Sequence, residues 1–225
     1  MPKRGEATPG ATSSGEAPHE KSLSPREKGA PRVIFRAALV TDSFEIAQYL
    51  CAAGGGLYEF LFDELVPLMT ANEFLTAGVA SDQSPISYRN CLVATRTDDG
   101  RVVGAVNAFP AAIIGSNGYR FVPRDRLDHI RPILQLQERD SLFLNALAVH
   151  ESVRHQGVGT TFLTWARARA GLLGMPRLSL HVWADNMFAR RFYEKQGFTQ
   201  RGVAEVPYHP RLRHSGGSIL MSQAI

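Results

Sequence analysis

The sequence of 225 residues contains only two cysteines, Cys51 and Cys91, and neither has a second cysteine or a histidine at metal-ligand spacing. This scarcity excludes a disulfide framework and a zinc ribbon, and it is typical of a protein from the reducing cytoplasm. Long hydrophobic runs are missing too. The longest nearly unbroken apolar stretch, residues 105–114, already contains Asn107 and Pro110, whereas a membrane helix needs roughly 20 apolar residues. We therefore expect no contact with the membrane.

The excess of positive over negative charge is also small. The 25 Lys and Arg residues outnumber the 21 Asp and Glu residues by only four, and no Lys or Arg run exceeds two residues. This pattern lacks the electrostatic footprint of a nucleic-acid-binding protein. The hydrophobic fraction of 44% is that of an ordinary globular domain.

Large apolar side chains are scarce in residues 1–31, where only Met1 and Leu23 are present, while five of the 13 prolines lie there. Such a segment cannot bury enough surface to offset the entropy cost of ordering it. We predict a disordered tail over residues 1–31 and a single domain over residues 32–225.

The domain shows alternating strand and helix patterns, which predict a mixed α/β sheet. The strands are expected at residues 32–39, 90–96, 101–109, 141–149, 177–183, 198–206 and 218–221. The helices are expected at residues 44–53, 57–69, 71–77, 157–173 and 186–196, with Pro67 kinking or ending the second of them. Phe188 and Phe192 are predicted to be core residues of the last helix, and His181 an ordinary residue of its strand.

The loop at residues 154–159, RHQGVG, joins a buried strand directly to a helix. The first amides of a helix have no internal acceptor, and the positive end of the helix dipole attracts anions. Gly157 and Gly159 carry no Cβ that could keep a phosphate away, and Arg154 can neutralise its charge. These features predict a pyrophosphate site, although glycine in such turns often serves packing alone.

A second motif follows the next strand. Residues 186–198, NMFARRFYEKQGF, carry Asn186, Ala189, Tyr193 and Gly197-Phe198. Together the two motifs resemble the GNAT superfamily of N-acetyltransferases, and the stretch LAVHESVRHQGVGT is most similar to the arylalkylamine N-acetyltransferases. The resemblance implies the GNAT fold, a twisted, mostly antiparallel sheet of about six to seven strands with flanking helices. It also implies transfer of an acetyl group from acetyl-CoA to a primary amine.

The resemblance assigns roles to individual residues. Tyr193, seven residues after Asn186 and on the same helix face, would protonate the departing CoA thiolate, and no metal is implied. A homodimer is compatible with the resemblance. The expected acetyl-CoA residues are Leu147, Ala148, Val149, Arg154, His155, Gln156, Gly157, Val158, Gly159, Thr160 and Asn186.

The residues that would deprotonate the amine are less evident. Arylalkylamine enzymes place two histidines where this chain has Phe143 and Asn145, and neither residue is a base. The proton must leave through ordered water, through Glu151 or another carboxylate, or the amine must bind neutral. Asn145 is a candidate catalytic residue, since a polar side chain in an apolar strand either bonds internally or faces a cavity.

The acceptor region offers two unusual features. Glu59, Asp63 and Glu64 could pair with a cationic amine or could simply face solvent. Residues 110–140 form a long insertion that is expected to act as a lid. The alternative function is a non-catalytic, regulatory CoA-binding module.

Deleting residues 1–30 should leave the melting temperature and the affinity for acetyl-CoA nearly unchanged, because this segment lacks core-forming side chains. Thermal denaturation and calorimetry of the full chain and the shortened chain test this. A loss of several degrees would mean that the tail docks on the domain.

Overall fold

A computed structural model describes residues 32–115 and 122–225, so the predicted tail lies outside the described residues. Seven strands form one sheet in the order β1-β2-β3-β4-β5-β7-β6. All neighbours are antiparallel except β4 and β5, which run parallel. The strands are β1 (Val33–Ala37), β2 (Cys91–Arg96), β3 (Val102–Pro110), β4 (Leu142–Val149), β5 (Arg177–Trp183), β6 (Thr199–Ala204) and β7 (Ser218–Ala224). The mixed, mostly antiparallel sheet expected from the sequence is thus confirmed.

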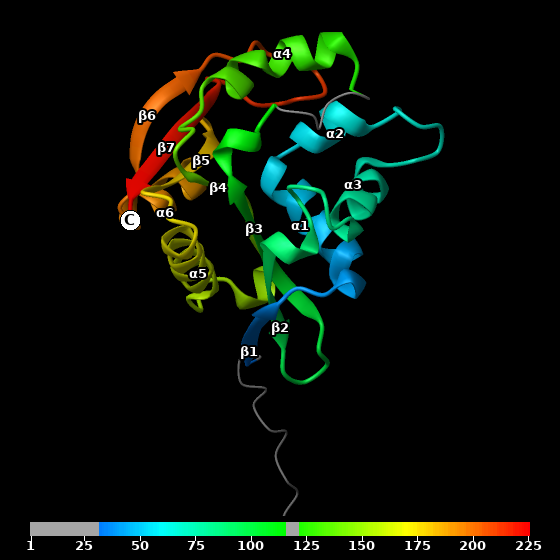
Figure 1. Ribbon diagram of the computed structural model, residues 1–225. Coiled ribbons are helices and arrows are strands. Elements are labelled where there is room, and N and C mark those ends of the chain that lie inside the picture. Colours follow the sequence, from blue (N-terminus) through cyan, green and yellow to red (C-terminus); the bar gives the residue numbers. More distant parts are fainter. Residues whose placement is uncertain (1–31, 116–121) are drawn as a thin grey trace, which may run out of the picture.

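Helices cover both faces of this sheet (Figure 1). On one face lie α5 (Val158–Leu172) and α6 (Met187–Lys195), whose core side chains pack with β4, β5 and β7 around the fully buried Phe162. The opposite face carries a second core, which four helices supply. These are α1 (Ser43–Gly54), α2 (Leu57–Phe62), α3 (Ala71–Ala80) and α4 (Arg124–Gln135).

The predicted helix at residues 57–69 is shorter in the structure, because α2 already ends at Phe62. The Asp63 carboxylate accepts a hydrogen bond from the Ala71 amide at 2.8 Å, which ties the end of α2 to the start of α3. Arg126 of α4 donates to the carbonyl oxygens of Leu61 and Asp63 at 3.2 and 2.8 Å. Distant contacts, rather than Pro67, therefore end the helix.

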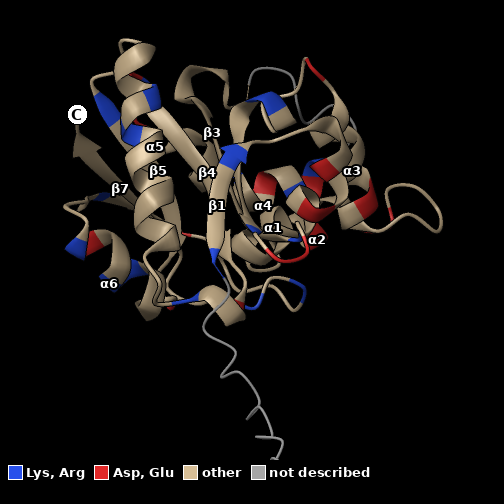
Figure 2. Ribbon diagram, turned by 90° about the horizontal axis from the view of Figure 1, so that it is seen from below, with Lys and Arg blue, Asp and Glu red and all other residues tan. Residues whose placement is uncertain are grey.

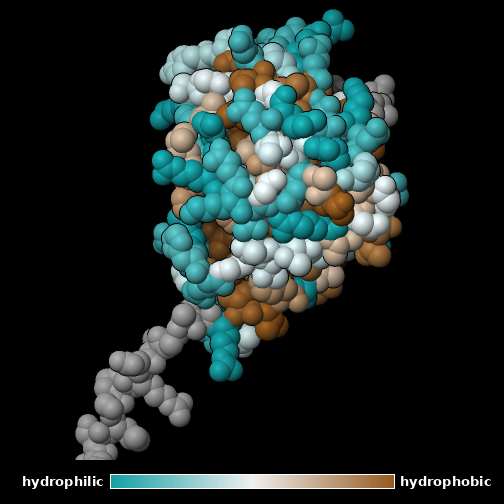
Figure 3. All heavy atoms as spheres, turned by 90° about the vertical axis from the view of Figure 1, so that its left-hand side faces the viewer, coloured by the Kyte–Doolittle hydropathy of each residue, from teal (hydrophilic) through white to brown (hydrophobic). Residues whose placement is uncertain are grey.

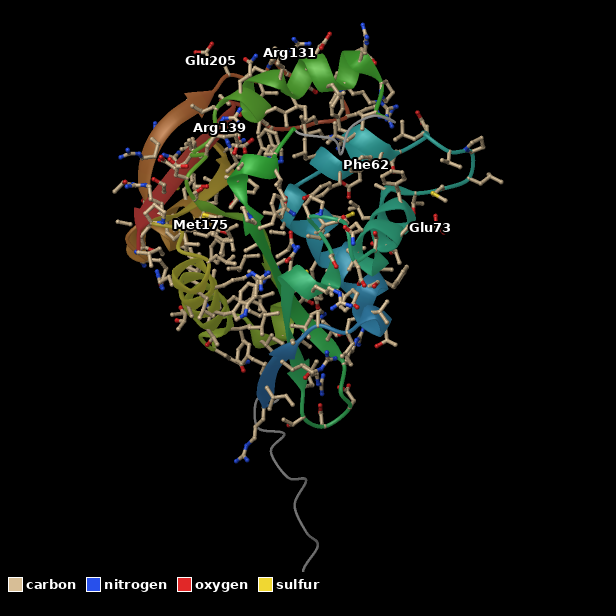
Figure 4. All side chains as sticks on the ribbon, viewed as in Figure 1. Phe62, Glu73, Arg131, Arg139, Met175 and Glu205 are labelled. Carbon is tan, nitrogen blue, oxygen red and sulfur yellow. The ribbon has the colours of Figure 1, made fainter. Side chains whose placement is uncertain are left out.

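The long insertion contains a helix that the sequence patterns did not predict, α4, while residues 116–121 lie outside the described residues. Leu127, Ile130 and Ile133 recur at helical spacing and face the core. Arg131 lies on the outer side of α4, above Phe62 of α2 (Figure 4). Pro132 inside the helix and its many charged residues conceal this pattern in the sequence.

Candidate functional site

The parallel strands β4 and β5 separate soon after they meet. They pair only at Leu142–Leu178 and Phe143–Ser179. Beyond this point the β3–β4 register shifts at Asn145, which has no partner of its own on β3. The edge of β4 that faces β5 therefore has no neighbouring strand from residue 144 onward. A cavity of about 1030 Å³ lies at this gap.

This cavity brings together nearly all of the site residues expected from the sequence. Gln156 is the exception, because it does not line the cavity and its side chain donates to the Ser152 carbonyl. The expected residues that do line it are Asn145, Leu147, Ala148, Val149, Arg154, His155, Gly157, Val158, Gly159, Thr160, Asn186 and Tyr193.

The loop before α5 presents free backbone amides to the cavity. Within the described residues, the amides of Val158, Gly159 and Thr160 have no acceptor in the helix and no capping side chain. His155 and Gly157 have positive φ angles of 61° and 81°, which turn the chain sharply into the helix. The loop can therefore bind an anion through its amides and the helix dipole.

The two loop glycines are needed for different reasons. Gly157 has a left-handed backbone, while a Cβ there would meet no atom within 4 Å. A Cβ on Gly159 would lie 3.2 Å from the ring of Phe192 on α6. Gly159 thus allows α5 and α6 to approach each other, whereas Gly157 is needed because its backbone is left-handed.

Asn186 and Tyr193 both line the cavity, as their spacing on one helix face predicts. Asn186 is also the N-cap of α6, and its Oδ1 accepts a hydrogen bond from the Ala189 amide at 3.1 Å. This cap leaves the side-chain amide group of Asn186 as the donor it can offer to a ligand.

Tyr193 is a buried residue whose ring packs edge-to-face against Phe192 and Phe198. In the part of the chain that the structure describes, its hydroxyl has no hydrogen-bond partner. Burial raises the pKa of Tyr193 above its ordinary value, because the phenolate would lose hydration. The phenol therefore stays protonated at neutral pH and can act as an acid.

Asn145 both faces the cavity and bonds internally. Its side-chain amide donates to Asn107 Oδ1 at 3.0 Å, and its Oδ1 accepts from the Tyr58 hydroxyl at 3.1 Å. Because Asn107 is only 1% exposed, Asn145 completes the hydrogen bonds of a buried group at the bulge. The geometry makes it a link between β3 and α2.

Replacing Asn145 by alanine should lower the free energy of unfolding by about 1–3 kcal/mol, because Asn107 Oδ1 would lose its partner in the interior. Urea unfolding measures this change. In the double variant Asn145→Ala/Asn107→Ala, the loss should be smaller than the sum of the single losses. Additive losses would show that the bond contributes nothing.

The cavity wall on the side of α1, α2 and α4 is mainly apolar and aromatic. Of the described residues that line the whole cavity, Glu151 is the single carboxylate. The residues of this wall include Tyr49, Tyr58, Phe62, Phe109, Ile130, Ile133, Leu134, Phe143 and Trp183.

Glu59, Asp63 and Glu64, which could either pair with a cationic amine or face solvent according to the sequence, do not line the cavity. Asp63 binds the Ala71 amide, as described above. Glu64 pairs with Arg211 at 3.0 Å and with Arg126 at 3.8 Å. Glu59 lies beside Cys51, whose pKa is raised to about 12 by burial and, to a lesser degree, by this glutamate. Asp63 and Glu64 therefore serve contacts between helices and loops, and none of the three carboxylates lies where it could meet an amine in the cavity.

Among the polar residues of the cavity wall that were not expected from the sequence are His181 on β5 and Ser218 at the start of β7. Their side chains lie 3.0 Å apart, between His181 Nδ1 and Ser218 Oγ. They are 37 residues apart in the sequence, so only the pairing of β5 with β7 brings them together. The one signal in the sequence is that Ser179 and His181 are polar within an apolar strand.

The surface around α6 also differs from the expectation. Phe188, predicted to lie in the core, is 72% exposed, while Phe192 is half-buried.

Lys and Arg residues lie along α5 and α6, and Asp and Glu residues lie mostly on the side of α1, α2 and α3 (Figure 2). The face that carries β6 and β7 is largely hydrophilic, with hydrophobic side chains in small patches (Figure 3).

Two further features bear on the classification. Within residues 32–115 and 122–225, no helix is long and apolar enough to cross a membrane. In the same residues, no group of three or more His, Cys, Asp and Glu side chains could hold a metal ion.

The fold is shared with solved acetyltransferase structures. An N-acetyltransferase from Staphylococcus aureus Mu50 is 17% identical, with a TM-score of 0.61 over 84% of this chain and 100% of that chain. A mosquito arylalkylamine N-acetyltransferase like 5b is 12% identical, with a TM-score of 0.61 over 86% and 100%. An agmatine N-acetyltransferase variant is 18% identical, with a TM-score of 0.56 over 86% and 99%. At these identities the likeness concerns the fold.

Sequence comparison identifies the family directly. No curated protein matches the chain, but the model of the acetyltransferase (GNAT) family matches residues 58–198, well over half of its length. This range includes β4, the loop at residues 154–159, Asn186 and Tyr193. The chain therefore belongs to the GNAT family of acetyltransferases.

Proposed function

We propose that this chain transfers the acetyl group of acetyl-CoA to a primary amine, which attacks the thioester directly. One observation carries the proposal: a single cavity joins the free amides of α5, the unpaired edge of β4 and Tyr193. These are the groups needed to hold a pyrophosphate, align an extended arm and protonate a leaving thiolate.

Two open backbone elements support the binding of acetyl-CoA. The pyrophosphate would bind the amides of residues 155–160, and Arg154 would neutralise part of its charge. The pantetheine arm would lie along Leu147–Val149 as an added strand, since β5 has turned away there. A free amide on this edge would polarise the thioester carbonyl. The thioester would then lie near Asn145, where the strands separate.

The amine would approach from the wall formed by α1, α2 and α4. Because this wall is aromatic and apolar and carries no carboxylate among its described residues, it favours an amine with an apolar substituent that binds in the neutral form. Attack forms the C–N bond and breaks the C–S bond, and Tyr193 donates its proton to the departing thiolate.

A panel of primary amines, including 2-phenylethylamine, agmatine and a lysine-containing peptide, tests the proposal. The expected result is release of CoA thiol that requires an amine, with the acetylated amine detected by mass spectrometry. A protein that binds acetyl-CoA in calorimetry but acetylates no amine would instead be the non-catalytic CoA-binding module. The presence of Tyr193 in the cavity argues for turnover, since binding alone needs no acid at the thiol.

A further inference from the structure

The proposed reaction requires a group that takes a proton from the attacking amine, and the carboxylate Glu151 lies at the wrong end of the site. An extended strand rises about 3.3 Å per residue, so the four residues from Asn145 to Val149 span about 13 Å, and Glu151 lies beyond the end of this strand. The thioester is expected near Asn145, while Glu151 lies beside the loop for the pyrophosphate. The acceptor must therefore lose its proton by another route.

His181 lies at the correct level of the sheet. Phe143 of β4 pairs with Ser179 of β5, so two residues further along His181 faces the gap at the level of Asn145. Leu180 packs in the core under α5, and alternation directs His181 to the opposite face, where its contact with Leu136 confirms its position. His181 is therefore on the amine side of the cavity, whereas Tyr193 packs in the core on the α5 and α6 side.

The hydrogen bonds of His181 fix its tautomer. Nε2 lies 2.8 Å from the Leu136 carbonyl oxygen, which can only accept, so Nε2 carries the proton. Nδ1 is then an acceptor, and the Ser218 hydroxyl donates to it at 3.0 Å. Gln137 Nε2 also lies 3.3 Å from His181 Nε2, but this amide nitrogen donates to the Ile133 carbonyl. Since both Gln137 Nε2 and the protonated His181 Nε2 are donors, no hydrogen bond joins them.

We propose that Ser218 and His181 form the proton relay that deprotonates the acceptor amine, an inference that rests on the proposed function. Ser218 is only 3% exposed and lines the cavity, and the hydroxyl that donates to His181 has lone pairs that can accept a proton. As the C–N bond forms, a proton moves from the amine nitrogen to Ser218 Oγ. The Ser218 proton moves in the same step to His181 Nδ1.

The protons balance over the catalytic cycle. The relay leaves an imidazolium at His181. The Leu136 carbonyl stabilises this cation through Nε2–H, but burial destabilises it by more, so it is a short-lived species that forms only as the C–N bond forms. The C–S bond breaks, and the thiolate takes the proton of Tyr193. After release of the products, His181 gives its proton to water and Tyr193 takes one from water. Burial lowers the pKa of His181 to about 4, the Leu136 bond opposes this, and no charged side chain contributes to the shift. His181 therefore starts the cycle neutral.

Ser218→Ala tests the relay, because it removes the hydroxyl and keeps the bond between His181 and Leu136. Ser179→Ala is the matched control. Ser179 is also a buried serine of this sheet, hydrogen-bonded to Ser141 Oγ at 2.6 Å, and it does not line the cavity. His181→Gln is the second variant, since its amide can still donate to Leu136 but cannot take up a proton. Melting temperatures and calorimetry with acetyl-CoA establish that each variant is folded.

The diagnostic readout is how the loss of kcat depends on amine basicity, measured with 2-phenylethylamine and its isostere O-benzylhydroxylamine, or with the best amine of the panel and its aminooxy analogue. A weakly basic amine loses its proton to water readily after attack, whereas a strongly basic one needs a base. We expect Ser218→Ala and His181→Gln to lower kcat by about 10-fold with the basic amine and much less with the aminooxy analogue. Ser179→Ala should retain kcat with both.

Two outcomes would overturn the inference in distinguishable ways. An equal loss of kcat with both amines, or no loss relative to Ser179→Ala, would reduce Ser218 and His181 to structural contacts while acetyl transfer itself stands. If the unaltered protein acetylates no amine, the proposed function fails and the relay fails with it.

Discussion

Replacing Tyr193 by phenylalanine should lower kcat by about 10- to 100-fold while the protein stays folded and binds acetyl-CoA with unchanged affinity. The change removes one hydroxyl and keeps the ring that packs against Phe192 and Phe198. General acid catalysis typically contributes about 10²-fold or more. A CoA thiol with a pKa near that of cysteine, roughly 8.5, is a tolerable leaving group unaided, so we expect the lower part of this range.

The pH dependence of this loss follows from the burial of Tyr193. Because its pKa is raised, the phenol keeps its proton throughout the ordinary pH range, and its acidity should set no basic limb in kcat/KM below about pH 10. The Tyr193→Phe variant must instead draw protons from solvent, so its deficit should grow as the pH rises.

Stopped assays of CoA release over a range of pH values measure both effects, with an amine for which the chemical step limits turnover. Phe198→Leu serves as a packing control, since it changes a buried neighbour of Tyr193 and leaves the hydroxyl in place. Equal kcat for Tyr193→Phe and the unaltered protein would show that Tyr193 is only a packing residue.

Replacing Gly157 by valine should weaken binding of acetyl-CoA by about 10-fold or more. A β-branched residue at a φ of 81° is strained, and relief of that strain would rotate the loop amides away from the phosphate position. A clash with the protein is not the cause, because a Cβ at Gly157 would meet no protein atom within 4 Å. The expected loss thus comes from backbone conformation and from the side chain standing where the anion would bind.

Gly174→Val supplies the matched control for this prediction. Gly174 follows the opposite end of α5 and has a positive φ of 65°, and a Cβ at this position would also meet no atom within 4 Å. Both variants should lose similar stability in thermal denaturation, but only Gly157→Val should lose affinity in calorimetry. Unchanged affinity of a folded Gly157→Val protein would contradict the assignment of this loop to acetyl-CoA.

The sequence by itself determined the parts of the site that depend on short-range structure. The loop at residues 154–159 is a turn with positive φ at His155 and Gly157 followed by the first residues of α5, and neighbouring residues set both features. Asn186, the N-cap of α6, and Tyr193 inside the helix both line the cavity, as helix geometry leads one to expect for residues seven apart. Both motifs could therefore be read without knowledge of the fold.

Only the tertiary structure decided the features that depend on contacts between distant segments. The end of α2 is set by Arg126 of α4, more than 60 residues later. Phe188 fits an apolar helix face by spacing, but it lies in the first turn of α6 beside His155 and the cavity, where it is exposed. Asn145 acquires its partners through a bulge and through α2, which no local pattern specifies.

The amine side of the site also depends on contacts between distant segments. His181 and Ser218 read as ordinary strand residues, because their relation depends on β7 being inserted between β5 and β6. The cavity exists because β4 and β5 separate after two residue pairs, which depends on segments more than 30 residues apart in the sequence. Local sequence determines which elements can bind an anion or supply an acid, whereas strand order and helix packing decide which polar groups meet the amine.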